Sequence, residues 1–309
     1  MIRRALLAGC ALLLLPGVAT AAACCVGSTV SQAERLGPCE FFSVGATWSI
    51  EARTGGWAAS GALKLGGQDR RLTQRLIATA AVRPARFMQV GMSVPLVLQW
   101  KRVAGTDGIG AGPGDLTVWT WVEPFEDLGA PPAVPLPEFG FLLTLPTGVP
   151  VERATAPVGA GATGTGYAVL RPSLRLGRTW LKGSLHAAGG LGISPPRPGE
   201  TRAPGVAWEG SINGAWFVRR DVTLSLLLGA TGLTRGFADG KPVGAPSIEP
   251  WLSAGVALAP RMKGRLNIGV RTSLPIPGLG RSQEATVLFA VGGTFVTRQR
   301  PTRARSRGV

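Results

Sequence analysis

Three of the four cysteines and the single histidine are the residues best suited to forming bonds or holding a metal. Cys24, Cys25 and Cys39 lie close together near the N-terminus, and His186 is far from them. A structural zinc site takes four thiolate or imidazole ligands, so these cysteines are a poor set, and we expect no metal and no cofactor. Cysteines of exported proteins form disulfides instead, so we expect a bridge from Cys25, or from Cys24, to Cys39.

An enzyme active site is not indicated. His186 is the only histidine available as a general base, and the sequence links it to no serine or cysteine nucleophile. Nucleophilic catalysis needs a nucleophile, a base and a group that orients the base. We therefore expect the chain not to be an enzyme, and we interpret His186 as a polar group on the inner face of a strand.

Charged residues recur at alternating positions of the predicted strands, and transport is the chemistry that they suggest. The candidates for a constriction inside a barrel are Arg171, Arg175, Lys182, Arg265, Arg271 and Glu209. A ring of basic side chains in a pore favours anionic solutes, including aromatic acids. The alternative is that these charges pair with one another across a narrow barrel and fill it.

The elements that would carry these residues are β-strands of roughly ten residues. Short basic turns at Gly177–Thr179, Arg219–Asp221 and Pro260–Lys263 alternate with long loops rich in glycine and proline. This rhythm predicts an all-β protein, a transmembrane antiparallel up-and-down β-barrel with about twelve strands. The predicted strands are 41–52, 75–82, 87–100, 114–122, 138–146, 166–176, 180–190, 206–218, 222–234, 248–259, 264–274 and 284–296.

Alternation of apolar and polar residues does not by itself distinguish a membrane barrel from a water-soluble barrel or sandwich. The chain has a mean hydropathy of +0.22, only 16% charged residues and 45 glycines, which suits strands that face lipid better than helices. Most aromatic residues fall near the two ends of the predicted strands, such as Phe139, Trp180 and Trp251. These two belts favour a membrane barrel.

The two ends of the chain differ from the barrel in composition. Residues 1–23 have a basic start, a short apolar core and an Ala-Thr-Ala cleavage site, so we expect a cleaved signal peptide. Residues 24–40 form a cysteine-containing segment that could plug the barrel, with lipidation of Cys24 left open. Residues 41–296 form the barrel and 297–309 a disordered basic tail. The net charge of +16 does not indicate nucleic-acid binding, because an exported chain does not meet nucleic acid.

Two motifs lie in the stretch from residue 87 to residue 148. The motif residues are Pro95, Gly110, Gly114 and Asp115, followed by Leu145, Pro146, Thr147 and Gly148. From the residues alone, glycine and proline should end strand pairing here, and Asp115 should accept hydrogen bonds from backbone amides at the base of a loop. In their order the motifs resemble the outer-membrane barrel family labelled MetA-pathway of phenol degradation. The resemblance implies passage of small hydrophobic or aromatic molecules.

The expected function is therefore an outer-membrane channel for passive passage of small hydrophobic or aromatic solutes. Its expected partners are outer-membrane lipid, the barrel-insertion machinery and the solute. The alternative is a closed structural or surface-interaction barrel of the outer membrane that transports nothing. The identity of the solute, the direction of passage and the oligomeric state are not contained in the sequence.

Overall fold

The computed structural model describes residues 36, 40–57, 63–65, 70–125, 134–196, 203–219, 221–239, 241–243, 246–261, 264–275 and 283–298. The predicted signal peptide, Cys24, Cys25 and Cys39, and most of the predicted basic tail lie outside these residues. Within them, no helix is long and apolar enough to cross a membrane. The described chain is built almost entirely from strands, as the sequence predicts.

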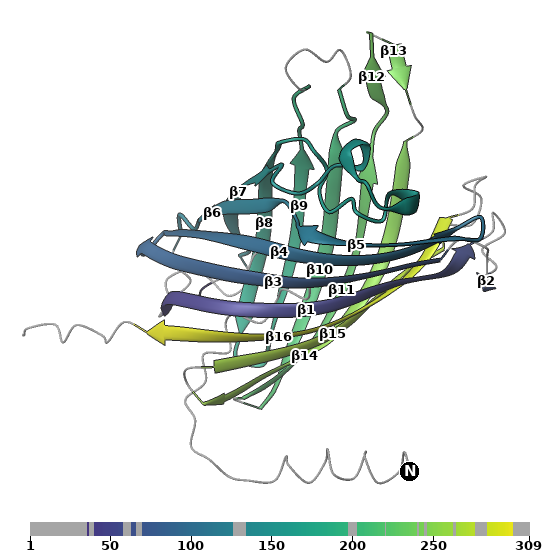
Figure 1. The fold of residues 1–309 in the computed structure, drawn as a ribbon. Helices are drawn as coiled ribbons and strands as arrows, with labels where there is room; N and C mark the ends of the chain where they lie inside the picture. Colours follow the sequence, from purple (N-terminus) through teal and green to yellow (C-terminus); the bar gives the residue numbers. More distant parts are fainter. Residues whose placement is uncertain are drawn as a thin grey trace, which may run out of the picture.

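Antiparallel strands close on themselves to form the barrel shown in Figure 1. The strands are β1 (Glu40–Trp57), β2 (Leu63–Leu65), β3 (Arg70–Ala85), β4 (Met88–Val103), β5 (Thr106–Pro113), β6 (Leu116–Val122), β7 (Leu136–Leu145), β8 (Val169–Trp180), β9 (Gly183–Gly192), β10 (Ala207–Arg219), β11 (Val222–Leu233), β12 (Gly236–Ala238), β13 (Lys241–Val243), β14 (Ser247–Arg261), β15 (Gly264–Ser273) and β16 (Gln283–Arg298). Two short 3₁₀ turns, η2 (Val151–Arg153) and η3 (Pro157–Gly159), lie between β7 and β8.

The ring has twelve strands, and the predicted number is confirmed. It closes where β1 pairs with β16, from Phe42 opposite Thr297 to Trp57 opposite Gln283. β5 and β6 share one place in the ring, because β4 pairs with β5 along one half and with β6 along the other. Closure matters because a barrel leaves no unpaired strand edge in the membrane.

Several predicted connections are wrong, because strands extend into them. The segment Gly177–Thr179 lies inside β8, and the turn follows at Leu181 and Lys182. Glycine is required at position 177 by packing rather than by a turn. A Cβ there would lie 1.8 Å from Nδ1 of His186 on β9. The region 101–113, predicted as a loop, is the tip of a β4–β5 hairpin whose turn residues Ala104 and Gly105 both have positive φ.

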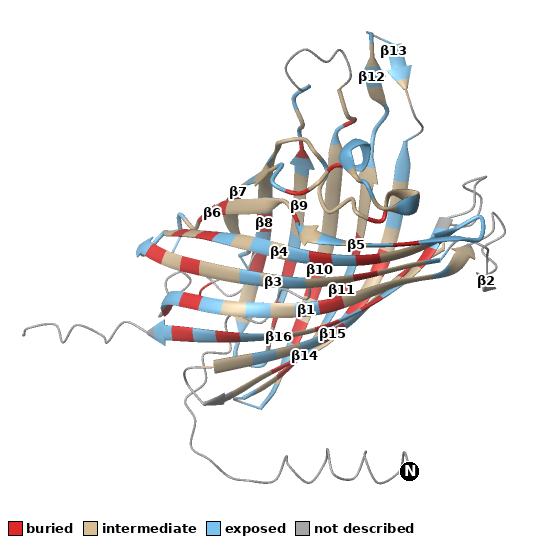
Figure 2. Cartoon of the chain, in the orientation of Figure 1, coloured by how far each residue is buried: buried red, intermediate tan, exposed pale blue. Residues whose placement is uncertain are grey.

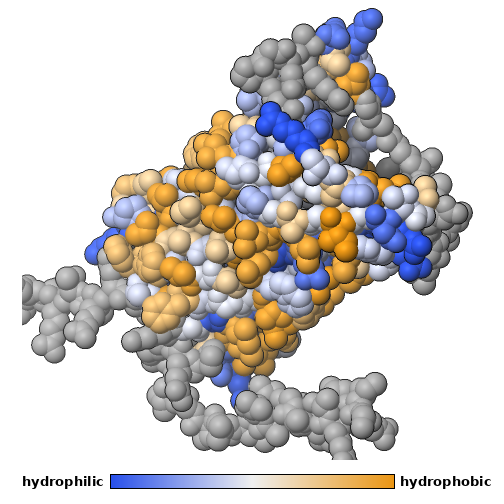
Figure 3. All heavy atoms as spheres, viewed as in Figure 1, coloured by the Kyte–Doolittle hydropathy of each residue, from blue (hydrophilic) through white to orange (hydrophobic). Residues whose placement is uncertain are grey.

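Burial alternates along the strands, which Figure 2 shows as bands of colour. On β11, Leu224, Leu226 and Leu228 are exposed, whereas Thr223 and Leu227 are buried on the opposite face. Successive strand residues face opposite sides, so the exposed leucines cover the outside of the barrel. Figure 3 shows the same pattern as hydrophobic residues spread over the barrel wall. An apolar outside and a polar inside are what a membrane barrel requires.

The predicted aromatic belts are only partly correct. Phe139, Trp180 and other rings are exposed on the outside, but Trp119, Trp121 and Trp251 are buried on the inner face. The inward tryptophans stand opposite glycines on neighbouring strands, in the pairs Trp119–Gly91, Trp121–Gly140 and Trp251–Gly229. A Cβ on Gly91 would lie 2.2 Å from the Trp119 ring. Alternation along the strand points these three side chains inward, and the glycine opposite each indole leaves room for the ring.

An arginine introduced on the outer face should lower the free energy of unfolding far more than an arginine introduced on the inner face. We expect Leu226→Arg to lower the free energy of unfolding by about 2–4 kcal/mol in lipid vesicles, because Leu226 is exposed near the middle of β11. Ser225→Arg places the same side chain on the inner face and is the matched control. Denaturant unfolding followed by tryptophan fluorescence measures both variants. Equal destabilisation would contradict the assignment of the two faces.

Candidate functional site

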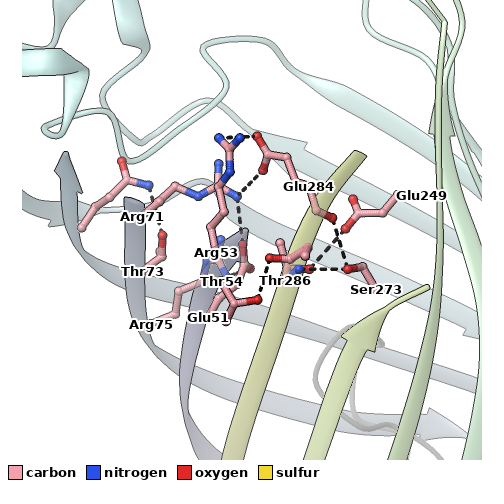
Figure 4. A network of polar contacts seen from close by, with 12 residues as sticks. Glu51, Arg53, Thr54, Arg71, Thr73, Arg75, Glu249, Ser273, Glu284 and Thr286 are labelled. Atoms are coloured by element: carbon pink, nitrogen blue, oxygen red, sulfur yellow. Dashed lines mark hydrogen bonds and ion pairs between the residues drawn. The ribbon is translucent and has the colours of Figure 1, made fainter. Parts of the chain in front are cut away.

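A ladder of ion pairs crosses the inner face of β1, β3 and β16 (Figure 4). Arg75 Nη1 and Arg71 Nη2 donate to the two carboxylate oxygens of Glu51, at 2.9 Å and 3.2 Å. Arg71 also reaches Glu284 at 3.4 Å, and Arg53 contacts the other oxygen of Glu284 at 3.1 Å. The charges alternate from Arg75 to Arg53, so the ladder ends in an arginine on both sides and carries one net positive charge.

Water reaches this ladder. The side chains of Arg53, Arg71 and Arg75 are 30%, 34% and 34% exposed, and that of Glu284 is 44% exposed. Because the residues lie on the inner face near the ends of β1, β3 and β16, this exposure is to the lumen and its mouth. The lumen is therefore wet at this level, and the ion pairs are worth less than fully buried pairs would be.

The predicted constriction residues Arg171 and Arg175 lie on the inner face of β8, where each is paired with a carboxylate. Arg171 Nη1 contacts Glu209 at 3.2 Å, and Arg175 Nε lies 3.6 Å from Glu138. The pair Arg175–Glu138 is largely buried, whereas Arg171–Glu209 is about one-third exposed. The alternative in which charges pair across neighbouring strands therefore describes these two arginines.

The other three predicted basic residues have different environments. Arg265 pairs with Glu40 at the start of β1, and both side chains are almost fully buried. Lys182 is exposed in the turn between β8 and β9, so its predicted position on a strand facing the lumen is wrong. Arg271 lies over the Trp251 ring, with its guanidinium carbon 5.3 Å from the ring centroid.

Leu36 is held inside the opposite end of the barrel. Its backbone N–H donates to Gln89 Oε1 at 2.8 Å, and its carbonyl oxygen accepts from Arg83 Nη2 at 2.8 Å. Arg83 is anchored in turn by Glu123 at 3.2 Å, and Glu123 also accepts from Gln89. The residues Arg83, Gln89 and Glu123 are here called the Leu36 clamp: Gln89 and Arg83 bind the backbone N–H and C=O of Leu36, and Glu123 holds both of them.

The Leu36 side chain is also enclosed. It is 2% exposed and packs with Ala81, Trp119 and Trp121, and Leu142 lies against this cluster. Burying a leucine removes apolar surface from water and stabilises the contact by about 1.5–3 kcal/mol. Together with the hydrogen bonds to its backbone, this burial attaches Leu36 to the inner wall.

At the other end, Asp115 fixes the connection between β7 and β8. Its Oδ1 accepts from the backbone N–H of Gly148 at 3.0 Å, and its Oδ2 accepts from the backbone N–H of Thr165 at 2.7 Å and from the hydroxyl of Thr165 at 2.9 Å. The prediction that Asp115 accepts from backbone amides at a loop base is confirmed. Charge-assisted hydrogen bonds of this kind are strong, so one carboxylate pins two points of the loop.

Other motif residues complete this loop base. The hydroxyl of Thr147 donates to Gly114 O at 2.8 Å and accepts from Leu116 N at 2.9 Å. Gly110 and Gly148 allow close packing, because a Cβ on either would lie within 3 Å of backbone atoms of the loop. The motifs therefore hold the 146–168 segment against β5 at the break between β5 and β6.

The catalytic and metal-binding possibilities gain no support. His186 is 8% exposed on the inner face of β9, beside Gly177. Among the described residues, no three or more His, Cys, Asp or Glu side chains are grouped so that they could hold a metal ion. What the arrangement offers is a lumen with fixed charges and bound segments at both ends.

Sequence reasoning missed Arg71 and Arg75 of the ladder, and it missed the Leu36 clamp. Arg71 was placed in a loop because the predicted strand began at residue 75, whereas β3 begins at Arg70. The alternating pattern Arg71, Thr73, Arg75 could have extended that strand. No local pattern points to Leu36, since its partners are 47 and 53 residues away in the sequence.

The comparisons with known proteins identify the architecture. The COG4313 outer membrane channel from Pseudomonas putida F1 superimposes with a TM-score of 0.61 at 12% identity, covering 84% of this chain and 96% of that one. The fold is that of an outer-membrane β-barrel. The β domain of the Bordetella autotransporter BrkA also superimposes, with a TM-score of 0.50 at 11% identity over 84% of this chain and 100% of that one. One neighbour is a channel and the other an autotransporter domain, so the likeness establishes the fold alone.

No protein-family model and no curated protein sequence matches the chain. The resemblance to the family labelled MetA-pathway of phenol degradation therefore rests on the motifs between residues 87 and 148. The structure gives those motifs a definite role, which is to hold the 146–168 loop at the end of the barrel.

Removing the Asp115 carboxylate should release the loop without unfolding the barrel. In Asp115→Ala we expect backbone amide exchange at Gly148 and Thr165 to accelerate at least about tenfold, because each amide loses a charged acceptor. Hydrogen-exchange mass spectrometry measures this. Asp107→Ala is the matched control, because Asp107 is exposed and lies 3.9 Å from its partner Arg102. Unchanged exchange in Asp115→Ala would contradict the role of the carboxylate.

Proposed function

We propose that the protein is an outer-membrane channel that passively admits small hydrophobic or aromatic solutes. The observation that carries the proposal is the water-exposed ion-pair ladder inside a closed barrel. A barrel whose only role is structural has no need of a wet lumen, and small barrels of that kind are filled by side chains. Here about one-third of the surface of three ladder arginines stays open.

The hydrophobic or aromatic nature of the solute is supported by the pair of motifs that resemble the family labelled MetA-pathway of phenol degradation.

We further propose that the segment before β1 plugs the lumen. Leu36 supports this, because it is clamped at the inner wall through both its backbone and its side chain. Glu40, four residues later, is almost fully buried against Arg265. Leu36 takes up space on the inner wall, so its release would widen the lumen at that end.

Single-channel conductance in a planar bilayer tests the channel proposal. We expect the refolded protein to conduct, and Arg75→Gln to reduce its preference for anions, because one oxygen of Glu51 then loses its cation. Arg102→Gln removes the same charge from an exposed position at the end of β4 and should leave the preference unchanged. A correctly folded barrel, heat-modifiable on gels, that never conducts would favour the closed structural alternative.

The plug proposal has its own test. Leu36→Ala should reduce the free energy with which this residue binds the inner wall by about 2–5 kcal/mol, the usual effect of truncating a buried leucine. We expect a longer open time or a larger conductance than in the unaltered protein. Leu181→Ala is the control, since Leu181 is 99% exposed in a turn. Identical conductance for Leu36→Ala and the unaltered protein would contradict the plug.

A further inference from the structure

The inner face of β5 has no side chains along most of its length. Its inward positions are all glycines, namely Gly108, Gly110 and Gly112. They stand opposite the inward residues of β4, which are Lys101, Gln99 and Val97. Directly opposite residues of an antiparallel pair share one face of the sheet. Gln99 and Val97 are buried, whereas Ile109 is 66% exposed on the outer face. β5 therefore presents bare backbone to the lumen.

The connection between β7 and β8 fills the space over these glycines. A Cβ on Gly108 would lie 2.2 Å from the carbonyl oxygen of Pro157, and a Cβ on Gly110 would lie 2.4 Å from Cα of Gly161. Ala160, next to Gly161, is 0% exposed. Because the Cβ of an inward residue points into the barrel, residues 157–163 lie on the lumen side of the wall. We call this stretch the inner loop.

Two side chains tie the inner loop to the wall. Lys101 Nζ donates to the carbonyl oxygen of Gly159 at 3.0 Å, and Thr163 Oγ1 donates to the carbonyl oxygen of Pro113 at 2.6 Å. Lys101 stands directly opposite Arg71 of β3, which belongs to the ion-pair ladder. The inner loop therefore lies beside the ladder, and a solute that passes one also passes the other.

The inner loop belongs to an excursion of the chain that leaves and returns at one point. The backbone N–H of Thr163 donates to Val149 O at 2.8 Å, and the backbone N–H of Val149 donates to Thr163 Oγ1 at 3.0 Å. Residues 150–162 thus have the closed form of an Ω-loop. Asp115 binds Gly148 and Thr165, which lie outside the excursion, so its removal leaves the loop base intact.

We propose that the inner loop is a constriction that sets the largest solute the channel admits, and that Lys101 is the residue that positions it. The loop occupies part of the lumen at the end of the barrel from which β12 and β13 project (Figure 1). Residues 154–168 contain no charged side chain, so this stretch limits size and leaves the charge preference to the ladder. The inference rests on the proposed function, because a constriction matters only where a solute passes.

Removing the excursion tests the constriction. Residues 150–162 are replaced by two glycines, and single-channel conductance is measured with polyethylene glycols of increasing size in the bath. We expect conductance to rise at least about twofold and larger polymers to enter, because the narrowest section of a pore sets both. Replacing Gly236–Val243 by two glycines is the matched control. This hairpin projects from the same end of the barrel (Figure 1), and its removal should leave both quantities unchanged.

Substitutions of Lys101 test its positioning role without depending on conductance. Lys101→Met removes the donor to Gly159 O, which also accepts from the backbone N–H of Ala162. We expect amide exchange of the inner loop to accelerate at least about tenfold, measured by hydrogen-exchange mass spectrometry, because a charged donor is lost. Lys101→Arg keeps a donor and should restore slow exchange. Arg102→Met, at an exposed position on the outer face, is the matched control and should change nothing.

The outcomes separate the constriction from the channel. Unchanged conductance and polymer size after the deletion, in a protein that conducts, overturns the constriction and leaves the channel in place. Conductance that appears only after the deletion supports the constriction and contradicts passive passage through the unaltered protein. No conductance from either barrel, each shown to be folded by heat-modifiability, overturns both. Unchanged exchange in Lys101→Met, or fast exchange that persists in Lys101→Arg, overturns the role of Lys101.

Discussion

The pairing of β1 with β16 is the interaction on which the rest of the structure depends. It joins the two ends of the barrel sequence along sixteen residue pairs, and it removes both open edges of the sheet. An open edge would leave backbone N–H and C=O groups unsatisfied in lipid, at a cost of several kcal/mol each. Closure also gives every strand one face toward lipid and one toward the lumen, which decides the environment of each side chain.

Charges on the inner face are arranged according to their exposure. Where the wall is packed, arginines are matched one to one, as in the largely buried pair Arg175–Glu138. Where water enters, they form the longer ladder of Figure 4, in which Glu51 and Glu284 are shared among three arginines. Buried charges need close partners because desolvation is expensive, whereas hydrated charges tolerate an excess of one sign. The excess of positive charge therefore lies in the water-exposed ladder.

The two ends of the barrel are held by different kinds of contact. At one end Asp115 binds backbone amides of a loop, so the loop is held by strong but solvent-accessible hydrogen bonds. At the other end Leu36 is held by burial together with hydrogen bonds to Arg83 and Gln89. The first contact holds a loop at the mouth of the barrel, and the second holds Leu36 against the inner wall. In the function that we propose, both control what passes.

The sequence by itself determined the class of fold and the number of strands, because alternation with period two and short turns are local patterns. It also pointed to Asp115, since a carboxylate after a glycine at a strand break has few partners other than nearby backbone amides. Only the tertiary structure decided which charges meet, because Arg71, Glu51 and Glu284 come from strands far apart in the sequence. It also decided that Trp119, Trp121 and Trp251 turn inward. The room for each indole comes from a glycine directly opposite on the neighbouring strand, and strand register is a property of the closed barrel rather than of any single segment.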